Sequence, residues 1–165
     1  MPSGWAASGR RCSTPTGATA PSCPDALQPG DRVMTASRGL AFAKLFVTDL
    51  DRSAEFYRAG LGLEPAQRFA TPEFDELVLR ARDGGGSLVL CRWKDGRALD
   101  RGNAHGPVGF VVGDVDSTYA ACCAAGAAAL FPPSAYGPAR VAIFRDPDGH
   151  SVEILNPGGA APQTK

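Results

Sequence analysis

The segment Phe144–Leu155 reads FRDPDGHSVEIL, a polar turn followed by a short apolar strand that carries one carboxylate. Its DPDG tetrapeptide has proline at the second position and glycine at the fourth, as a type I turn favours. Alternation along the strand places Val152 and Ile154 on one face and Glu153 on the other. The segment therefore predicts the last hairpin of a sheet, with Glu153 on the opposite face from the apolar residues.

The chain repeats itself around this segment. FVTDLDRSAEFYRAGLGL, which begins at Phe46, is repeated more weakly at an offset of 65 by VVGDVDSTYAACCAAGAAAL from Val111. RDGGGSLVL from Arg82 aligns at an offset of 63 with RDPDGHSVE from Arg145. Two halves that share an order of elements indicate a duplication.

Each half is expected to form a strand, a helix and three further strands. Asp51 is a plausible helix N-cap, and Gly60 ends the helical pattern that contains Phe56 and Tyr57. Proline and glycine residues separate the strand candidates that follow. In order, the expected elements are 40–47, a helix at 51–60, 64–70, 74–81 and 87–93, then 107–112, a helix at about 116–125, 127–131, 140–145 and 151–155.

Composition excludes several classes of partner. The 165 residues include 17 basic and 17 acidic side chains, so no net charge attracts nucleic acid or an anionic membrane. No apolar run reaches the roughly 18 residues that span a bilayer, so we expect a cytoplasmic protein with no nucleic-acid or membrane partner. Five cysteines at irregular spacing indicate reduced thiols.

Three regions differ in composition. Residues 1–38 are rich in Pro, Gly, Ser and Thr and lack hydrophobic periodicity, which predicts a disordered extension. An organelle transit peptide and a true start at Met34 both remain open for this stretch. Residues 39–157 are predicted to form one domain of two repeats, at about 39–93 and 106–157, and residues 158–165 a flexible tail.

The paired βαβββ order resembles that of a known superfamily. VTDLDRSAEFYRAGLGL after the first strand and FRDPDGHSVEIL at the end are similar to the vicinal oxygen chelate superfamily, which includes glyoxalase I, extradiol dioxygenases and bleomycin resistance proteins. The resemblance implies an α+β fold in which paired modules form a curved mixed sheet. Helices are expected on its convex face and a ligand cleft on its concave face.

Strand alternation divides the sheet residues between those faces. The set expected under the helices is Leu45, Val47, Val89, Cys91, Trp93, Val108, Phe110, Val112, Val152 and Ile154. The set expected on the concave face is Phe42, Lys44, Phe46, Leu88, Leu90, Arg92, Pro107, Gly109, Val111, Ser151, Glu153 and Leu155. Apolar and aromatic surface with a few charged groups is typical of a small-molecule pocket. The predicted ligand-binding residues are Phe42, Lys44, Phe46, Leu90, Arg92, Pro107 and Glu153.

Metal ligands in this superfamily lie in the first and last strand of each half. The resemblance places those positions at Phe42, Leu90, Pro107 and Glu153. Only Glu153 can bind a metal, and catalytic metal sites usually need two or three protein ligands. His105 is a candidate for a further ligand, and His150 is expected to be an exposed turn residue. We therefore expect no cofactor, with a divalent metal as the alternative.

Two roles stay open for Glu153. It is either a buried carboxylate satisfied by Lys44 or Arg92, or a hydrogen-bond acceptor or general base in the cleft, which makes it the candidate catalytic residue. The favoured function is metal-independent binding of a small organic molecule, resembling proteins that sequester an antibiotic or a metabolite. The alternative is an enzyme, either a metal-dependent lyase, isomerase or dioxygenase or a metal-free one with Glu153 as base. The resemblance also implies a homodimer.

Overall fold

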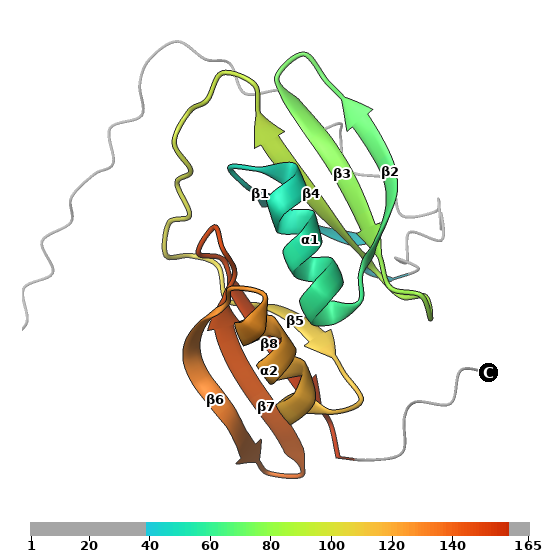
Figure 1. Ribbon diagram of the computed structural model, residues 1–165, viewed down its shortest axis with the longest axis vertical. Coiled ribbons are helices and arrows are strands. Elements are labelled where there is room, and N and C mark those ends of the chain that lie inside the picture. Colours follow the sequence, from blue (N-terminus) through green and yellow to red (C-terminus); the bar gives the residue numbers. More distant parts are fainter. Residues whose placement is uncertain (1–38, 159–165) are drawn as a thin grey trace, which may run out of the picture. The chain divides into compact units, whose positions relative to one another are not determined.

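The computed structural model describes residues 39–158, which contain two βαβββ modules (Figure 1). The first module comprises β1 (Phe42–Phe46), α1 (Leu50–Leu61), β2 (Glu64–Ala70), β3 (Phe74–Arg80) and β4 (Ser87–Trp93). The second comprises β5 (Val108–Val111), α2 (Val115–Ala124), β6 (Ala128–Tyr136), β7 (Ala139–Arg145) and β8 (Ser151–Asn156). The predicted α+β class and element order are confirmed. The predictions for residues 1–38 and for the tail from 159 lie outside the described residues.

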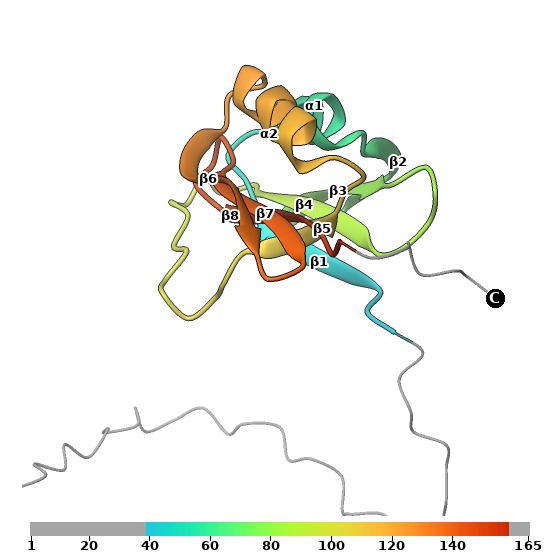
Figure 2. The same cartoon turned by 90° about the horizontal axis from the view of Figure 1, so that it is seen from below.

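Each module forms a four-stranded mixed sheet. The strand orders are β1-β4-β3-β2 and β5-β8-β7-β6, with the β1–β4 and β5–β8 pairs parallel and the others antiparallel. Figure 2 shows both helices on the same side of the sheets. Neither helix within residues 39–158 is long and apolar enough to cross a lipid bilayer.

The first helix starts and ends at residues other than those predicted. Asp49, rather than Asp51, is the N-cap, because its carboxylate accepts hydrogen bonds from the backbone N–H groups of Asp51 and Arg52. Gly62 ends the helix in the left-handed conformation at φ 66°. Gly60 therefore lies inside the helix, where it packs against Cys122 of α2.

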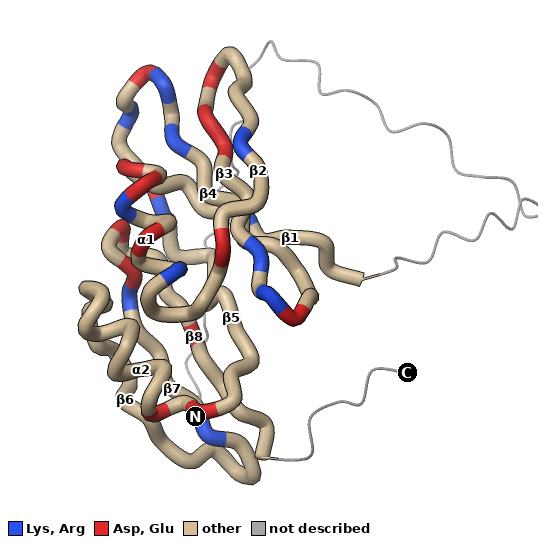
Figure 3. Tube along the Cα trace, turned by 45° about the vertical axis from the view of Figure 1, so that its right-hand side comes forward, with Lys and Arg blue, Asp and Glu red and all other residues tan. Residues whose placement is uncertain are grey.

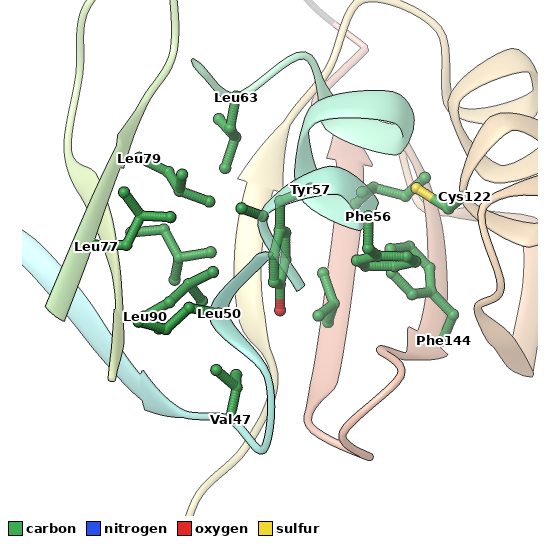
Figure 4. Close-up of a cluster of buried hydrophobic side chains, with 14 of the residues drawn as sticks. Val47, Leu50, Phe56, Tyr57, Leu63, Leu77, Leu79, Leu90, Cys122 and Phe144 are labelled. Carbon is green, nitrogen blue, oxygen red and sulfur yellow. The ribbon is translucent and has the colours of Figure 1, made fainter. Parts of the chain in front are cut away.

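One hydrophobic core joins the two modules. Leu77, Leu79 and Leu90 of the first sheet and Phe144 of the second pack against the helices, with Tyr57 fully buried among them (Figure 4). The rings of Phe56 and Phe144 meet edge to face, with centroids 6.2 Å apart. Removal of this apolar surface from water is the main driving force for folding of the domain.

A polar network also connects the modules, through the turn before β8. Asp146 accepts a hydrogen bond from the Tyr57 hydroxyl at 2.7 Å. Asp148, whose side chain is 1% exposed, accepts hydrogen bonds from Ser53, from Arg52 and from both the backbone and the hydroxyl of Thr48. The carboxylates come from the second module and the donors from the first.

The predicted facing of β4 is wrong. Leu88 and Leu90 are buried in the core under the helices, and Val89 and Cys91 face the other way. The pairs Lys44–Val89 and Gly109–Glu153 occupy equivalent places in the two parallel ladders. The offset is 65 for the first strands (109 − 44) but 64 for the last (153 − 89).

The extra residue lies in the turn before β4. Arg80 pairs with Ser87, whereas Arg145 pairs with Ser151, so six residues separate the strands in the first module and five in the second. The counterpart of Arg145 is thus Arg80 and not Arg82. One inserted residue shifts all of β4 by one, which moves every side chain to the opposite face.

Candidate ligand-binding site

A cavity of about 910 Å³ lies beside the segment that links the two modules. It is called the linker cavity below. Its lining consists of residues 43–46 of β1, Trp93 at the end of β4, linker residues 97–103, 105 and 106, Val108, Arg145 and residues 149–151. Figure 3 shows basic positions along the linker between β4 and β5. The linker forms one wall of this cavity.

Two residues of an aromatic cluster, Phe46 and Trp93, form another wall. The rings of Phe46 and Trp93 are stacked with centroids 4.1 Å apart, and Phe74 meets both rings edge-on. The Arg97 guanidinium lies 4.3 Å from the Trp93 centroid. Trp93 was expected under the helices, but the corrected facing of β4 puts it on the cavity side.

Next to the aromatic cluster is a polar group of three side chains. Lys44 forms an ion pair with Glu76, and the Cys91 thiol lies 3.7 Å from the same carboxylate. The hydrogen bond that Lys44 donates to the Glu76 carboxylate raises the pKa of Lys44, and burial raises the pKa of Cys91 to about 12. Sequence reasoning missed Glu76, although alternation along FDELV places it on the same face as Phe74 and Val78.

Glu153 lies on the concave face as predicted, opposite Gly109 and Ile143 in the ladders. It is half-buried, and within residues 39–158 its carboxylate has no hydrogen bond or ion pair. Lys44 and Arg92, the neighbours expected to satisfy it, are paired with Glu76 and Asp75 instead. Ser151 lines the cavity, so Glu153 lies beside it, about 7 Å further along the same face.

The two histidines both reach the linker cavity. His105 is exposed in the linker, and because β5 begins only at Val108, strand alternation does not govern its direction. His150 is half-buried, not an exposed turn residue. Its Nε2 lies 2.7 Å from the backbone oxygen of Phe46, and since a carbonyl only accepts, this nitrogen carries the proton.

Only some of the predicted ligand-binding residues line the linker cavity. Lys44 and Phe46 line the cavity. Phe42 is 51% exposed, and Pro107 is exposed just before β5. The inclusion of Leu90 and Arg92 follows from the wrong facing of β4, because Leu90 is in the core and Arg92 lies on that same face, paired with Asp75.

The residues at the four strand positions do not fit a metal site. By the observed register these positions are Phe42, Val89, Pro107 and Glu153, which together offer one donor group. Across residues 39–158, no three His, Cys, Asp or Glu side chains are grouped to hold an ion.

Comparison with known proteins now identifies the family. A model of the Glyoxalase/Bleomycin resistance protein/Dioxygenase superfamily matches residues 39–154. The chain belongs to this superfamily. The expected resemblance is thereby confirmed.

Relatives within the superfamily include a Vibrio cholerae protein named "Probable lactoylglutathione lyase". It is 28% identical over 117 residues, which cover 67% of this chain and 85% of the Vibrio protein. A solved structure of a glyoxalase I variant from Zea mays is 28% identical with a TM-score of 0.64, and the match covers 71% of this chain but only 45% of the maize enzyme. The Leishmania major glyoxalase I is 24% identical with a TM-score of 0.63, over 73% of this chain and 88% of that one.

Proposed function

We propose that this superfamily member is a metal-independent binding protein that sequesters a small organic molecule, an antibiotic or a metabolite, in the cytoplasm. The observation that carries the proposal is the donor set at the four strand positions. Three of the four positions, Phe42, Val89 and Pro107, carry hydrocarbon side chains. A single carboxylate is below the usual minimum for holding a catalytic divalent ion.

The linker cavity supports binding as the function. Its volume of about 910 Å³ is in the range of small-molecule sites. Aromatic, aliphatic and charged side chains alternate around it, so an organic ligand gains both apolar burial and polar anchoring there. Glu153 lies beside the cavity with no described partner for its carboxylate, which leaves it available as an acceptor for a ligand hydroxyl or amine.

A homodimer forms a second part of the proposal. Large apolar side chains are exposed on strands of both sheets, namely Phe42 (51%), Phe69 (46%), Val111 (70%), Phe131 (45%) and Tyr136 (77%). Exposed apolar surface favours association with another protein surface. Light scattering coupled to size exclusion is expected to give twice the mass of one chain, and a monomer at all concentrations would contradict this.

An enzyme is the second candidate. The observation in its favour is the name of the Vibrio cholerae relative, with which this chain shares 28% identity. Metal-free chemistry would use Glu153 as the base. Lactoylglutathione lyase activity that is lost in a Glu153→Gln variant, while the variant keeps its melting temperature, would establish this candidate instead.

The direct test compares metals and organic ligands. Elemental analysis of the untagged protein is expected to show less than stoichiometric metal. Addition of Ni²⁺, Zn²⁺, Mn²⁺ or Fe²⁺ under anaerobic conditions is expected to leave the melting temperature unchanged, because selective binding to the folded state would raise it. A library of small organic molecules is expected to contain ligands that do raise it. A stoichiometric metal that disappears in Glu153→Gln would overturn the proposal.

A further inference from the structure

The charges around the linker cavity are unbalanced. Four cationic side chains line it, Lys44, Arg97, Arg101 and Arg145, against one acidic side chain, Asp100. Lys44 and Arg97 are already neutralised, by Glu76 and Asp95 respectively, neither of which lines the cavity. The charges left without an ion pair are therefore those of two guanidinium groups.

Those two groups come from different elements. Arg101 belongs to the linker, and within residues 39–158 it makes no ion pair. Arg145 ends β7 and is exposed, and its side chain has no hydrogen bond or ion pair to any other described residue. Asp100 accepts a hydrogen bond from the backbone of Gly102 at 3.0 Å and is exposed. One acid cannot balance both arginines.

Arg101 is held in place without losing its charge. One Nη1–H donates to the backbone oxygen of Asp148 at 2.8 Å. Its Cζ and Nε would both lie 3.4 Å from a Cβ at position 149, so the guanidinium rests against the bare backbone of Gly149. A guanidinium has five N–H donors, and this contact uses one of them. The group is thus positioned in advance, which lowers the entropy cost of binding an anion.

The aromatic wall favours recognition by charge rather than by ring stacking. Phe46 covers one face of Trp93 at 4.1 Å, and Arg97 lies 4.3 Å from the same centroid. Both cannot occupy one face, so each face of the indole is covered. A ligand ring cannot stack on Trp93. Aliphatic lining residues, among them Leu99 and Val108, still offer apolar contact.

We propose that the linker cavity binds an organic dianion, with two carboxylates or one phosphate monoester, through Arg101 and Arg145. Guanidinium forks bind carboxylate and phosphate oxygens in pairs of parallel hydrogen bonds. This inference rests on the proposed binding function and specifies its ligand class.

The experiment uses the full chain and a series of probes that share one ring but differ in charge: phenyl phosphate, benzoate, benzamide and benzamidinium. Succinate is added to separate dicarboxylates from phosphate monoesters. Calorimetric titration at pH 7.5 is expected to give affinity that falls in the order dianion, monoanion, neutral, cation. The affinity of the bound dianion is expected to weaken as salt concentration rises.

Substitutions test whether Arg101 and Arg145 bind the dianion. Arg101→Met and Arg145→Met are each expected to weaken the dianion about tenfold or more, since each removes charge-assisted hydrogen bonds. Arg101→Lys keeps the charge but loses the fork, so its affinity is expected to fall between those of wild type and Arg101→Met. Arg82→Met is the control, because the Arg82 side chain is 79% exposed, pairs with Glu64 and does not line the cavity.

The outcomes separate this inference from the proposed function. Benzamide or benzamidinium could bind as tightly as phenyl phosphate and lose affinity in Arg101→Met or Arg145→Met. In that case the binding function stands and the dianion class is wrong. If the dianions bind equally well to the Arg101→Met/Arg145→Met double variant, the assigned residues are wrong. If neither these probes nor a broad library binds, both proposals fail. Unchanged melting temperatures of the variants confirm that folding is intact.

Discussion

The Asp148 carboxylate in the second module accepts a 2.7 Å hydrogen bond from the Ser53 hydroxyl in helix α1 of the first. Arg52 and Thr48 donate to the same carboxylate, whose side chain is 1% exposed. A buried charge with this many donors is costly to alter, because the donors lose a charged partner in a place that water does not reach.

Asp148→Asn is therefore expected to lower the free energy of unfolding by about 2–3 kcal/mol. The substitution keeps the volume and removes the charge opposite Arg52. Urea denaturation followed by circular dichroism measures the change. Asp83→Asn, an exposed aspartate in the corresponding turn of the first module, serves as the control and is expected to change little. Equal stability of the two variants would show that the buried carboxylate does not stabilise the domain.

The same carboxylate predicts a pH dependence. Burial acts to raise the pKa of Asp148, but hydrogen bonds from Thr48, Ser53 and Arg52 outweigh it, so the pKa is lowered from its ordinary 3.8. A group whose pKa is lower in the folded state stabilises fully above the unfolded value, and its contribution is lost as pH falls through the folded value. The stability difference between wild type and Asp148→Asn is expected to shrink below about pH 4. A constant difference between pH 7 and pH 3 would contradict the assignment.

Close packing of the two helices gives a third prediction. A Cβ at Gly60 would lie 2.8 Å from the Cys122 sulfur and 3.2 Å from its Cα. Gly60→Ala is expected to destabilise the domain by about 1–3 kcal/mol through this overlap. Gly113→Ala, which meets nothing within 4 Å, is the control. In a double-mutant cycle, Cys122→Ala is expected to relieve part of the loss of stability caused by Gly60→Ala. Strictly additive changes in the free energy of unfolding would show that residues 60 and 122 are not in contact.

The corrected facing of β4 can be tested by placing a carboxylate at successive positions. Leu90→Glu puts a charge in the core, where Leu90 is fully buried, and is expected to cost more than about 4 kcal/mol. Val89→Glu places it opposite Lys44 in the parallel ladder, where the ammonium offsets part of the burial cost. Chemical denaturation should show the smaller loss for Val89→Glu. A larger loss for Val89→Glu than for Leu90→Glu would restore the facing predicted from the sequence.

Adjacent cysteines should differ in reactivity. Cys122 is fully buried and burial raises the pKa of its thiol to about 12, whereas Cys123 is partly exposed. A raised pKa lowers the thiolate fraction, and the thiolate is the nucleophile. Brief treatment of the native protein with iodoacetamide at pH 8, followed by peptide mass spectrometry, is expected to find label on Cys123 and little on Cys122. In urea, both cysteines are expected to be labelled equally. Equal labelling of Cys122 and Cys123 in the native protein would contradict the burial of Cys122.

Local signals predicted the fold because they recur in both halves. The aspartate before each helix and the apolar face of β8 fixed the order of elements and the direction of Glu153. β4 was different, since Leu88 to Cys91 are all apolar and carry no alternation. The apolar pattern of β4 therefore could not distinguish its two faces, and one extra residue in the preceding turn makes the true offset to β8 64 rather than 63.

The site was less predictable because it depends on contacts across the chain. His150 reaches the backbone of Phe46, 104 residues away, and Arg101 rests against Gly149. Neither contact has a local pattern in the sequence. Alternation along β3 places Glu76 on one face of the sheet. Its position beside Lys44 also depends on the strand order, in which β1 and β3 both pair with β4.

The side-chain hydrogen bonds to the carboxylates of Asp146 and Asp148 in the second module are donated by four residues of the first module. At the offset of 65, the second module has Gly113, Ser117, Thr118 and Cys122 in place of the donors Thr48, Arg52, Ser53 and Tyr57. The turn before β4 in the first module contains one aspartate, Asp83, where the turn before β8 contains two. After duplication, each half has therefore come to depend on the other for a partner that it cannot supply to itself. The halves are no longer interchangeable copies but complementary parts, and neither would find in its own duplicate the contacts that it makes in this chain.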